Sequence, residues 1–186
     1  MKRVILLTTG GTIASGTGPQ GLAPTLSGAD LLARVPEIAR LCRATVRDVL
    51  RLDSSNMQPE DWSELAETTC GALAHADGVV VTHGTDTLAN TAAMLTFMLQ
   101  GLDRPVILTG SQYPIDAPGS DGPRNLEDAF LAALADCPGV HVVFGGSILR
   151  GVRTVKMRTR SRNAFESVNA PPVGSVADGR VILDGP

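Results

Sequence analysis

Two apolar runs constrain the fold of this chain more than any other feature. Gly78–Thr82 and Val140–Phe144 are short, rich in β-branched residues and bounded by glycine. Runs of this kind are typical of strands that are buried on both faces, as the strands of parallel sheets are. Three further apolar runs have the length and composition of strands, and they span Arg3–Thr8, Ala44–Leu50 and Pro105–Leu108.

Segments with helical character alternate with these runs. Pro59 opens one that extends to about His75, with acidic residues in its first turn. The others span Thr85–Leu99, residues 122 to about 135, and the shorter Ser27–Arg34. This alternation predicts an α/β fold, in which a mostly parallel sheet is sandwiched by helices in the flavodoxin-like or Rossmann-like manner.

The end of the chain has a different pattern. Gly174–Leu183 carries Asp178-Gly179 between two short apolar stretches, which predicts a hairpin. The alternative is that residues 174–186 begin a linker. At 186 residues, the chain suits one domain that spans 1–186.

Charge and cysteine usage exclude several classes of protein. The net charge is −3 and no run of Lys and Arg forms a nucleic-acid footprint. No apolar stretch is long enough for a signal peptide or a membrane span, so we expect a cytoplasmic protein that does not bind membranes. The three cysteines are far apart, which predicts ordinary buried residues and neither a metal site nor a disulfide framework.

Polar turns follow the predicted strands, at the sheet edge where parallel α/β proteins bind ligands. After the first strand, Gly10 and Gly11 allow a sharp turn that brings backbone N–H groups close to a ligand, and Thr12 adds a hydroxyl. A phosphate-binding turn has a similar composition, so a nucleotide-binding protein is one alternative. The turn lacks the third glycine of a dinucleotide motif and the Gly-Lys-Ser/Thr of a P-loop.

The turn after the third strand contains Thr82-His83-Gly84-Thr85-Asp86-Thr87. Thr85 or Asp86 could cap the following helix, but a cap does not require the whole polar cluster. A hydroxyl nucleophile needs a base. His83 is one candidate, although no Gly-x-Ser-x-Gly motif accompanies it. A lysine with a lowered pKa is another candidate, and Lys156 is available unless it is an ordinary surface charge.

Two further turns add hydroxyl groups at the same edge. Ser54 and Ser55 follow the second strand and could bind a substrate carboxylate, or they could cap a helix ahead of Pro59. Ser111 lies in the turn after the fourth strand. We therefore predict that Ser54, Ser55 and Ser111 contribute to a substrate site.

In combination and order, these segments resemble the bacterial-type L-asparaginase family. The resemblance extends over nearly the whole chain, from Arg3 to about Gly185. The segments that carry it are Thr9–Ala14, Asp53–Met57, Thr82–Thr87, Asp121–Leu126 and Lys156 with Ala164–Asn169.

The resemblance implies a reaction and a role for each residue. Thr12 would attack the side-chain amide of L-asparagine and form an acyl-enzyme, ammonia would leave, and water would release L-aspartate. Thr85, Asp86 and Lys156 would form a second catalytic group, in which Lys156 shares a proton with Thr85. Asp86 would also bind the substrate ammonium, and the backbone N–H groups of Gly11 and Thr85 would hold the oxyanion. No metal and no organic cofactor is implied, and a homo-oligomer is expected.

Two features depart from the family pattern. Members commonly carry a tyrosine in the loop after the first motif, whereas Ser15–Thr25 has none. Thr17, Thr25 or a water molecule could replace it, and the glycine-rich loop could act as a lid. Members also have a smaller C-terminal domain, and this sequence resembles a short form without it.

Three other functions stay open at this point. A glutaminase-asparaginase differs only by accepting a substrate with one more methylene, so L-glutamine is a possible second substrate. The related domain that supplies ammonia to a tRNA-dependent amidotransferase would share the same chemistry. A non-catalytic amino-acid-binding module would keep the fold without turnover.

Overall fold

The computed structural model describes residues 1–18 and 21–184, and its centre is an eight-stranded sheet of order β12-β11-β8-β7-β6-β5-β1-β4. Five neighbouring strands are parallel: β4 (Arg43–Leu52), β1 (Arg3–Gly10), β5 (Gly78–Thr82), β6 (Pro105–Thr109) and β7 (Gly139–Phe144). These are the five predicted strands, extended by one to three residues in four cases. The predicted mostly parallel sheet is confirmed.

The remaining strands of this sheet are antiparallel. They are β8 (Ser147–Arg150), β11 (Gly174–Ala177) and β12 (Arg180–Leu183). The hairpin predicted around Asp178-Gly179 is confirmed, and both turn residues have positive φ angles, 50° and 70°. A two-residue hairpin loop of type I′ requires this conformation at both positions. Residues 185–186, the end of the alternative linker, lie outside the described residues.

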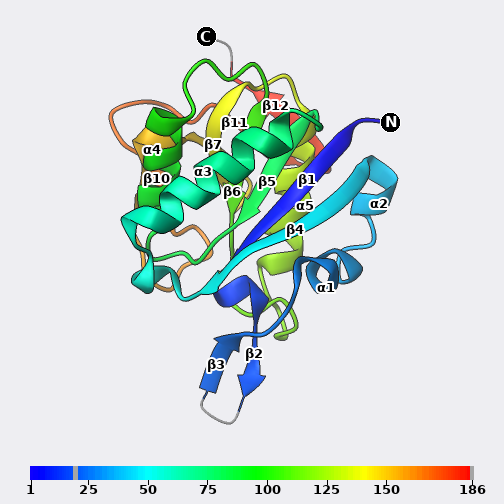
Figure 1. The fold of residues 1–186 in the computed structure, drawn as a ribbon, viewed down its shortest axis with the longest axis vertical. Coiled ribbons are helices and arrows are strands. Elements are labelled where there is room, and N and C mark those ends of the chain that lie inside the picture. The colour runs from blue at the N-terminus through cyan, green and yellow to red at the C-terminus, as the bar shows by residue number, and fades with distance from the viewer. Residues whose placement is uncertain (19–20, 185–186) are drawn as a thin grey trace.

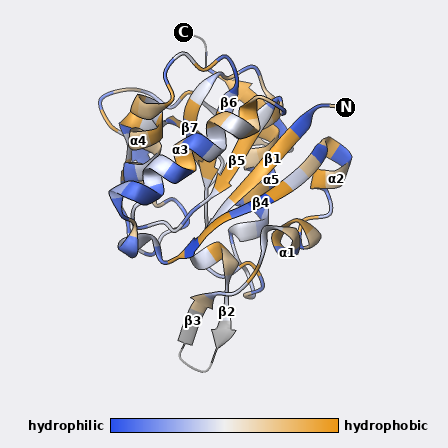
Figure 2. Ribbon diagram, viewed as in Figure 1, coloured by the Kyte–Doolittle hydropathy of each residue, from blue (hydrophilic) through white to orange (hydrophobic). Residues whose placement is uncertain are grey.

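Helices cover both faces of the sheet (Figure 1). One face carries α3 (Pro59–Leu73) and α4 (Leu88–Met98), and the other carries α1 (Gly28–Ala33), α2 (Ile38–Leu41) and α5 (Gly122–Leu134). Successive strand residues alternate between the two cores: Val79 and Val81 pack with α3 and α4, whereas Val80 packs with α5. The strands are accordingly apolar along most of their length (Figure 2).

Most helix ends agree with the sequence prediction to within two residues, but the start of α4 does not. The prediction placed it at Thr85, whereas the helix begins at Leu88 and residues 85–87 form a turn. Thr87 is the N-cap and has a non-helical backbone, with φ −115° and ψ 12°. Thr85 and Asp86 therefore lie before the helix and are free to face the carboxyl edge of the sheet.

Short elements that the sequence did not reveal carry parts of the site. β2 (Ser15–Gly18) and β3 (Gly21–Pro24) form a hairpin that projects from the body of the molecule, where the sequence indicated a loop (Figure 1). Residues 19–20 of that loop lie outside the described residues. β9 (Thr154–Lys156) pairs with β10 (Phe165–Ser167) and carries Lys156. Three 3-10 helices span Thr12–Ala14, Ser54–Asn56 and Gly151–Arg153.

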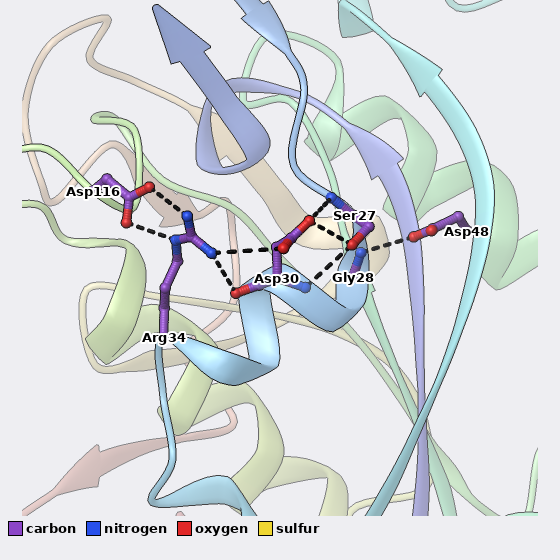
Figure 3. Close-up of polar contacts among 6 residues, drawn as sticks. All are labelled: Ser27, Gly28, Asp30, Arg34, Asp48 and Asp116. Atoms are coloured by element: carbon purple, nitrogen blue, oxygen red, sulfur yellow. Dashed lines mark hydrogen bonds and ion pairs between the residues drawn. The ribbon is translucent and has the colours of Figure 1, made fainter.

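Polar contacts anchor α1, which follows the β2–β3 hairpin (Figure 3). Ser27 and Asp30 form a capping box at its N-terminus. Asp48 on β4 accepts hydrogen bonds from Gly28 N and Thr8 Oγ1. Arg34 donates two hydrogen bonds to Asp116, of 2.6 and 2.8 Å, and thereby lowers the pKa of that carboxyl group. The return limb of the hairpin is thus tied to the sheet and to a distant loop.

Asp128 on α5 gives a prediction about stability. Its side chain is 8% exposed, and its Oδ2 lies 3.6 Å from Arg124 Nε with no hydrogen-bond partner among the described residues. Burial raises the pKa of Asp128 to about 6. The folded state therefore binds a proton more tightly than the unfolded state, so this carboxyl group reduces stability as the pH rises from about 4 to about 6.

We expect Asp128→Asn to increase the free energy of unfolding by up to about 3 kcal/mol above pH 6 and to change it little at about pH 4. Urea denaturation of both proteins at about pH 4 and about pH 8 measures this difference. An equal difference at both pH values would contradict the buried-carboxylate explanation.

Two sequence expectations concern regions far from the site. Among residues 1–18 and 21–184, no helix has the length and apolarity to span a bilayer. Cys42 and Cys137 are buried as predicted, whereas Cys70 is exposed, because it lies on the outer side of α3.

Candidate active site

A cavity of about 330 Å³ lies at the carboxyl ends of the parallel strands. β1 has β4 on one side and β5 on the other, and the connections to these neighbours run over opposite faces of the sheet. Such a reversal of strand order opens a crevice at the end of the central strand. The lining comes from the turns after β1, β4 and β5, and from Ala23 and Pro24 of the β2–β3 hairpin.

The turns after β1 and β5 are in direct contact, and two glycines make this possible. A Cβ atom on Gly11 would lie 2.4 Å from Gly84 N, and one on Gly84 would lie 2.5 Å from Ser54 Oγ. Gly11 also has a φ of 76°, which L side chains rarely adopt. The three turns therefore pack through backbone atoms, and this brings Thr12, Thr85 and Ser54 to the wall of one cavity.

Lys156 joins this cavity from the β9–β10 hairpin. Its Nζ donates a hydrogen bond of 2.8 Å to Thr85 Oγ1 and one of 2.6 Å to Asp86 Oδ1. The lysine side chain is 15% exposed, whereas that of Asp86 is 65% exposed. Lys156 is thus a paired, largely buried cation, and the interpretation as an ordinary surface charge is wrong.

The geometry also directs the Thr85 hydroxyl group. Its oxygen accepts the hydrogen bond from Lys156, so its own proton is available for a different acceptor. Because Thr85 lines the cavity, that acceptor is an atom of a bound molecule or of water. Thr12, Thr85, Asp86 and Lys156 are therefore brought together as the sequence predicted.

The backbone donors differ from the expectation in one respect. Gly11 N donates to Leu52 O at 3.1 Å, so this N–H group is engaged in the contact between β1 and β4 and cannot hold an oxyanion. A register shift between Thr8 and Gly10 produces this contact. Within the described chain, Thr12 N and Thr85 N donate to no protein acceptor, and both residues line the cavity. These two N–H groups replace the predicted pair.

The three predicted serines are in different situations. Ser54 is buried and lines the cavity, and Thr87 Oγ1 holds its backbone by donating to Ser54 O at 2.8 Å. Ser55 is exposed and donates its hydroxyl to Asp53 Oδ1 at 2.7 Å, outside the lining of the cavity. Ser111 is fully buried and donates its hydroxyl to Tyr113 O. The structure thus brings only Ser54 into the site.

Sequence reasoning overlooked Thr87 and Asp53. Thr87 fixes Ser54, and its signal was its place at the predicted start of α4. Asp53 caps the 3-10 helix that presents Ser54, and it lines the cavity. Hydrogen bonds from the N–H and hydroxyl of Ser55 lower the pKa of Asp53, so it stays ionised. Among the described residues, no group of three or more His, Cys, Asp or Glu side chains is placed to hold a metal ion.

This arrangement has the components of an acyl-transfer site. A half-buried hydroxyl, two unpaired N–H groups and a threonine paired with a lysine face one space. The N–H groups can stabilise a developing oxyanion, and the lysine-paired hydroxyl can pass a proton. The carboxylates of Asp86 and Asp53 give part of the cavity a negative potential, which favours a cationic group on the ligand.

Comparisons with known proteins agree with this chemistry. Residues 3–186 match the family model for the N-terminal region of asparaginases. L-asparaginase from Thermococcus kodakarensis is 42% identical, and the match covers 97% of this chain and 56% of that protein. A subunit of glutamyl-tRNA(Gln) amidotransferase from Methanosarcina barkeri is 39% identical, with coverage of 95% and 44%.

Solved structures show the same fold. The thermostable L-asparaginase of Thermococcus kodakarensis superimposes with a TM-score of 0.87 at 39% identity, over 99% of this chain and 56% of that one. A probable cytoplasmic L-asparaginase from Campylobacter jejuni gives a TM-score of 0.90 at 34% identity, over 100% and 57%. The chain spans about half the length of the curated relatives it matches.

Proposed function

The chain belongs to the asparaginase family, and from this premise we propose that it hydrolyses the side-chain amide of L-asparagine to L-aspartate and ammonia. Residues 1–186 would act as one domain of the N-terminal type. The observation that carries the proposal is the contact of Lys156 with Thr85 and Asp86, in a cavity that Thr12 also lines.

The proposed reaction begins with Thr12 as the nucleophile. Its Oγ1 forms a bond to the amide carbon, and the N–H groups of Thr12 and Thr85 stabilise the oxyanion that results. The C–N bond then breaks, and the leaving nitrogen needs one proton to depart as ammonia. The Thr12 hydroxyl loses one proton in the same step, so the Thr85–Lys156 pair only has to transfer it.

The second half of the reaction mirrors the first. A water molecule attacks the acyl group on Thr12 and gives one proton back to the threonine oxygen, and L-aspartate leaves. The enzyme thus returns to its starting state without a redox step. Thr85 stays in place for both halves because Lys156 and the backbone contacts of its turn hold it.

Substrate recognition follows from the charges of the cavity. The ammonium group of an amino acid would lie near Asp86, and its carboxylate would accept a hydrogen bond from the Ser54 hydroxyl. Ser54 Oγ accepts only a long contact of 3.4 Å from Thr87 N, so its proton is free for the ligand.

We expect Ser54→Ala to raise KM for L-asparagine by about tenfold, with a much smaller change in kcat, because the contact binds the ground state and the transition state alike. Steady-state ammonia release measures both constants. Ser55→Ala is the matched control, since the Ser55 hydroxyl is engaged with Asp53. Equal effects of the two variants would contradict the role given to Ser54.

The direct test of the function is ammonia release by this chain alone, from L-asparagine and from L-glutamine. The proposal expects turnover of L-asparagine and a lower kcat/KM for L-glutamine. One methylene is worth about 1–3 kcal/mol in a pocket, so some glutaminase activity is compatible with the same site. Absence of ammonia from both amides would refute the function.

A second candidate is favoured by the 39% identity to glutamyl-tRNA(Gln) amidotransferase proteins. In this case the chain would release ammonia for a partner and depend on that partner for full activity. Turnover of L-asparagine that is independent of any added protein favours the first proposal. Ammonia release that appears only when a partner protein is present favours the second.

A further inference from the structure

His83 occupies an unusual position next to the site. It follows β5 directly and precedes Gly84, Thr85 and Asp86, yet it is fully buried and does not line the cavity. Its ring lies on the α3–α4 side of the sheet, where its Nε2 is 3.0 Å from Thr91 Oγ1. Trp62 on α3 donates its indole N–H to the same Thr91 oxygen at 2.9 Å. A buried polar chain thus leads from α3 through α4 to the active-site turn.

The hydrogen bonds of this chain have only one consistent direction. The Gly84 carbonyl can only accept, so His83 Nδ1–H donates to it at 2.8 Å. His83 Nε2 then carries the lone pair and accepts from the Thr91 hydroxyl. The Thr91 oxygen accepts in turn from Trp62, whose indole N–H can only donate. Both ring nitrogens are engaged in a neutral imidazole, and burial lowers the pKa of His83 to about 4, in agreement.

This arrangement determines how the peptide between Gly84 and Thr85 is oriented. The peptide is trans, so its C=O and N–H groups point in opposite directions. His83 holds the Gly84 oxygen on the side away from the cavity. The Thr85 N–H must therefore point toward the cavity, and it has no other acceptor among the described residues.

We propose that His83 is a positioning residue for the oxyanion site: the chain Trp62–Thr91–His83 fixes the Gly84 carbonyl and thereby aims the Thr85 N–H at the oxygen of the scissile amide. The inference rests on the proposed amide hydrolysis. It excludes His83 as the base of the reaction, because its Nδ1 donates to the backbone and its Nε2 faces α4.

The consequence is specific to one kinetic constant. An oxyanion forms only in the transition state and the intermediate, so a misdirected Thr85 N–H lowers kcat and leaves KM nearly unchanged. Complete loss of an oxyanion donor costs about 10²–10³-fold in kcat. A donor that is present but no longer held should cost less, roughly tenfold.

The kinetic test compares His83→Leu with His83→Asn. The amide nitrogen of asparagine can take the place of Nδ1 as donor to Gly84 O, whereas leucine fills the space without a donor. We expect kcat to fall roughly tenfold in His83→Leu with KM unchanged, and to recover to within about threefold of wild type in His83→Asn. His141→Leu is the matched control, since His141 is also buried but contacts Cys137 and Pro138 instead. Equal kcat in the wild type and both His83 variants would overturn the inference.

A spectroscopic test separates this inference from the proposed function. The ¹⁵N spectrum of the wild-type chain at about pH 7 should show His83 as the neutral Nδ1–H tautomer, and the Nε2–H tautomer or an imidazolium would overturn the inference. The Thr85 amide resonance should shift in His83→Leu and return in His83→Asn. An unmoved resonance would overturn the inference. If the wild type releases no ammonia, the proposed function fails, and the spectra still decide the role of His83.

Discussion

In a Thr12→Ala variant, ammonia release from L-asparagine should fall by at least about 10³-fold in kcat. Thr12 is the only residue to which the proposed reaction assigns a covalent bond with the substrate. Its hydroxyl accepts and donates no hydrogen bond within the described residues, so its removal leaves the rest of the cavity intact. The variant should therefore fold normally and bind L-aspartate with nearly unchanged affinity.

Thr12→Ser is the matched control for this variant. Serine keeps the nucleophilic oxygen and loses only the γ-methyl group, so it should retain activity within about 10²-fold of wild type. Stopped ammonia assays of the three proteins measure kcat, and thermal denaturation verifies the fold. Alanine and serine variants of equal activity would show that the nucleophile lies elsewhere.

Replacement of Lys156 by methionine has the second largest expected effect. Methionine has a similar length but no charge, so Thr85 loses its hydrogen-bond donor and Asp86 loses its ion-pair partner. General acid–base groups contribute about 10²–10⁴-fold to rates, and we expect a fall in kcat of this size. Substrate binding should weaken less, because Asp86 remains ionised for the ammonium group.

Lys156→Arg distinguishes a proton carrier from a counter-charge. Arginine keeps the positive charge next to Asp86, but its guanidinium does not give up a proton in proteins. If Lys156 transfers protons through Thr85, the arginine variant should be nearly as slow as the methionine variant. If Lys156 only balances the charge of Asp86, the arginine variant should keep most of the activity, and the proposed proton transfer would be wrong.

The sequence predicted the sheet well because its strands follow simple physical rules. Gly78–Thr82 and Gly139–Phe144 are buried on both faces, so both sides must be apolar and a continuous β-branched run results. The order of the strands did not follow from these runs. It depends on which face each connecting helix covers, and the parallel pairing of β1 with both β4 and β5 is a tertiary property.

The start of α4 shows the limit of capping signals. Thr85, Asp86 and Thr87 are all acceptable caps, so composition alone cannot choose among them. The structure uses Thr87, and its side chain bonds to Ser54 O instead of capping its own helix. A contact across two turns thus decides the end of a helix, and no local pattern encodes it.

The predicted site residues divide for the same reason. Ser54 and Ser111 both follow strands and have similar neighbours, but β6 lies one strand farther from β1, and Ser111 bonds to Tyr113 instead. The engagement of Gly11 N with Leu52 O depends on the register shift in β1, which the sequence does not show. Lys156 was found only by resemblance to a family, since its strand has three residues and no pattern.

The most direct measurement is the identity of the residue that carries the acyl group. Wild-type chain mixed with L-asparagine and quenched in acid can be digested and analysed by mass spectrometry. The account predicts an aspartyl ester on Thr12, in the peptide that contains Gly10 and Gly11, and none in the Thr12→Ala variant. An aspartyl ester on Thr85, or one that persists in the Thr12→Ala variant, would contradict it.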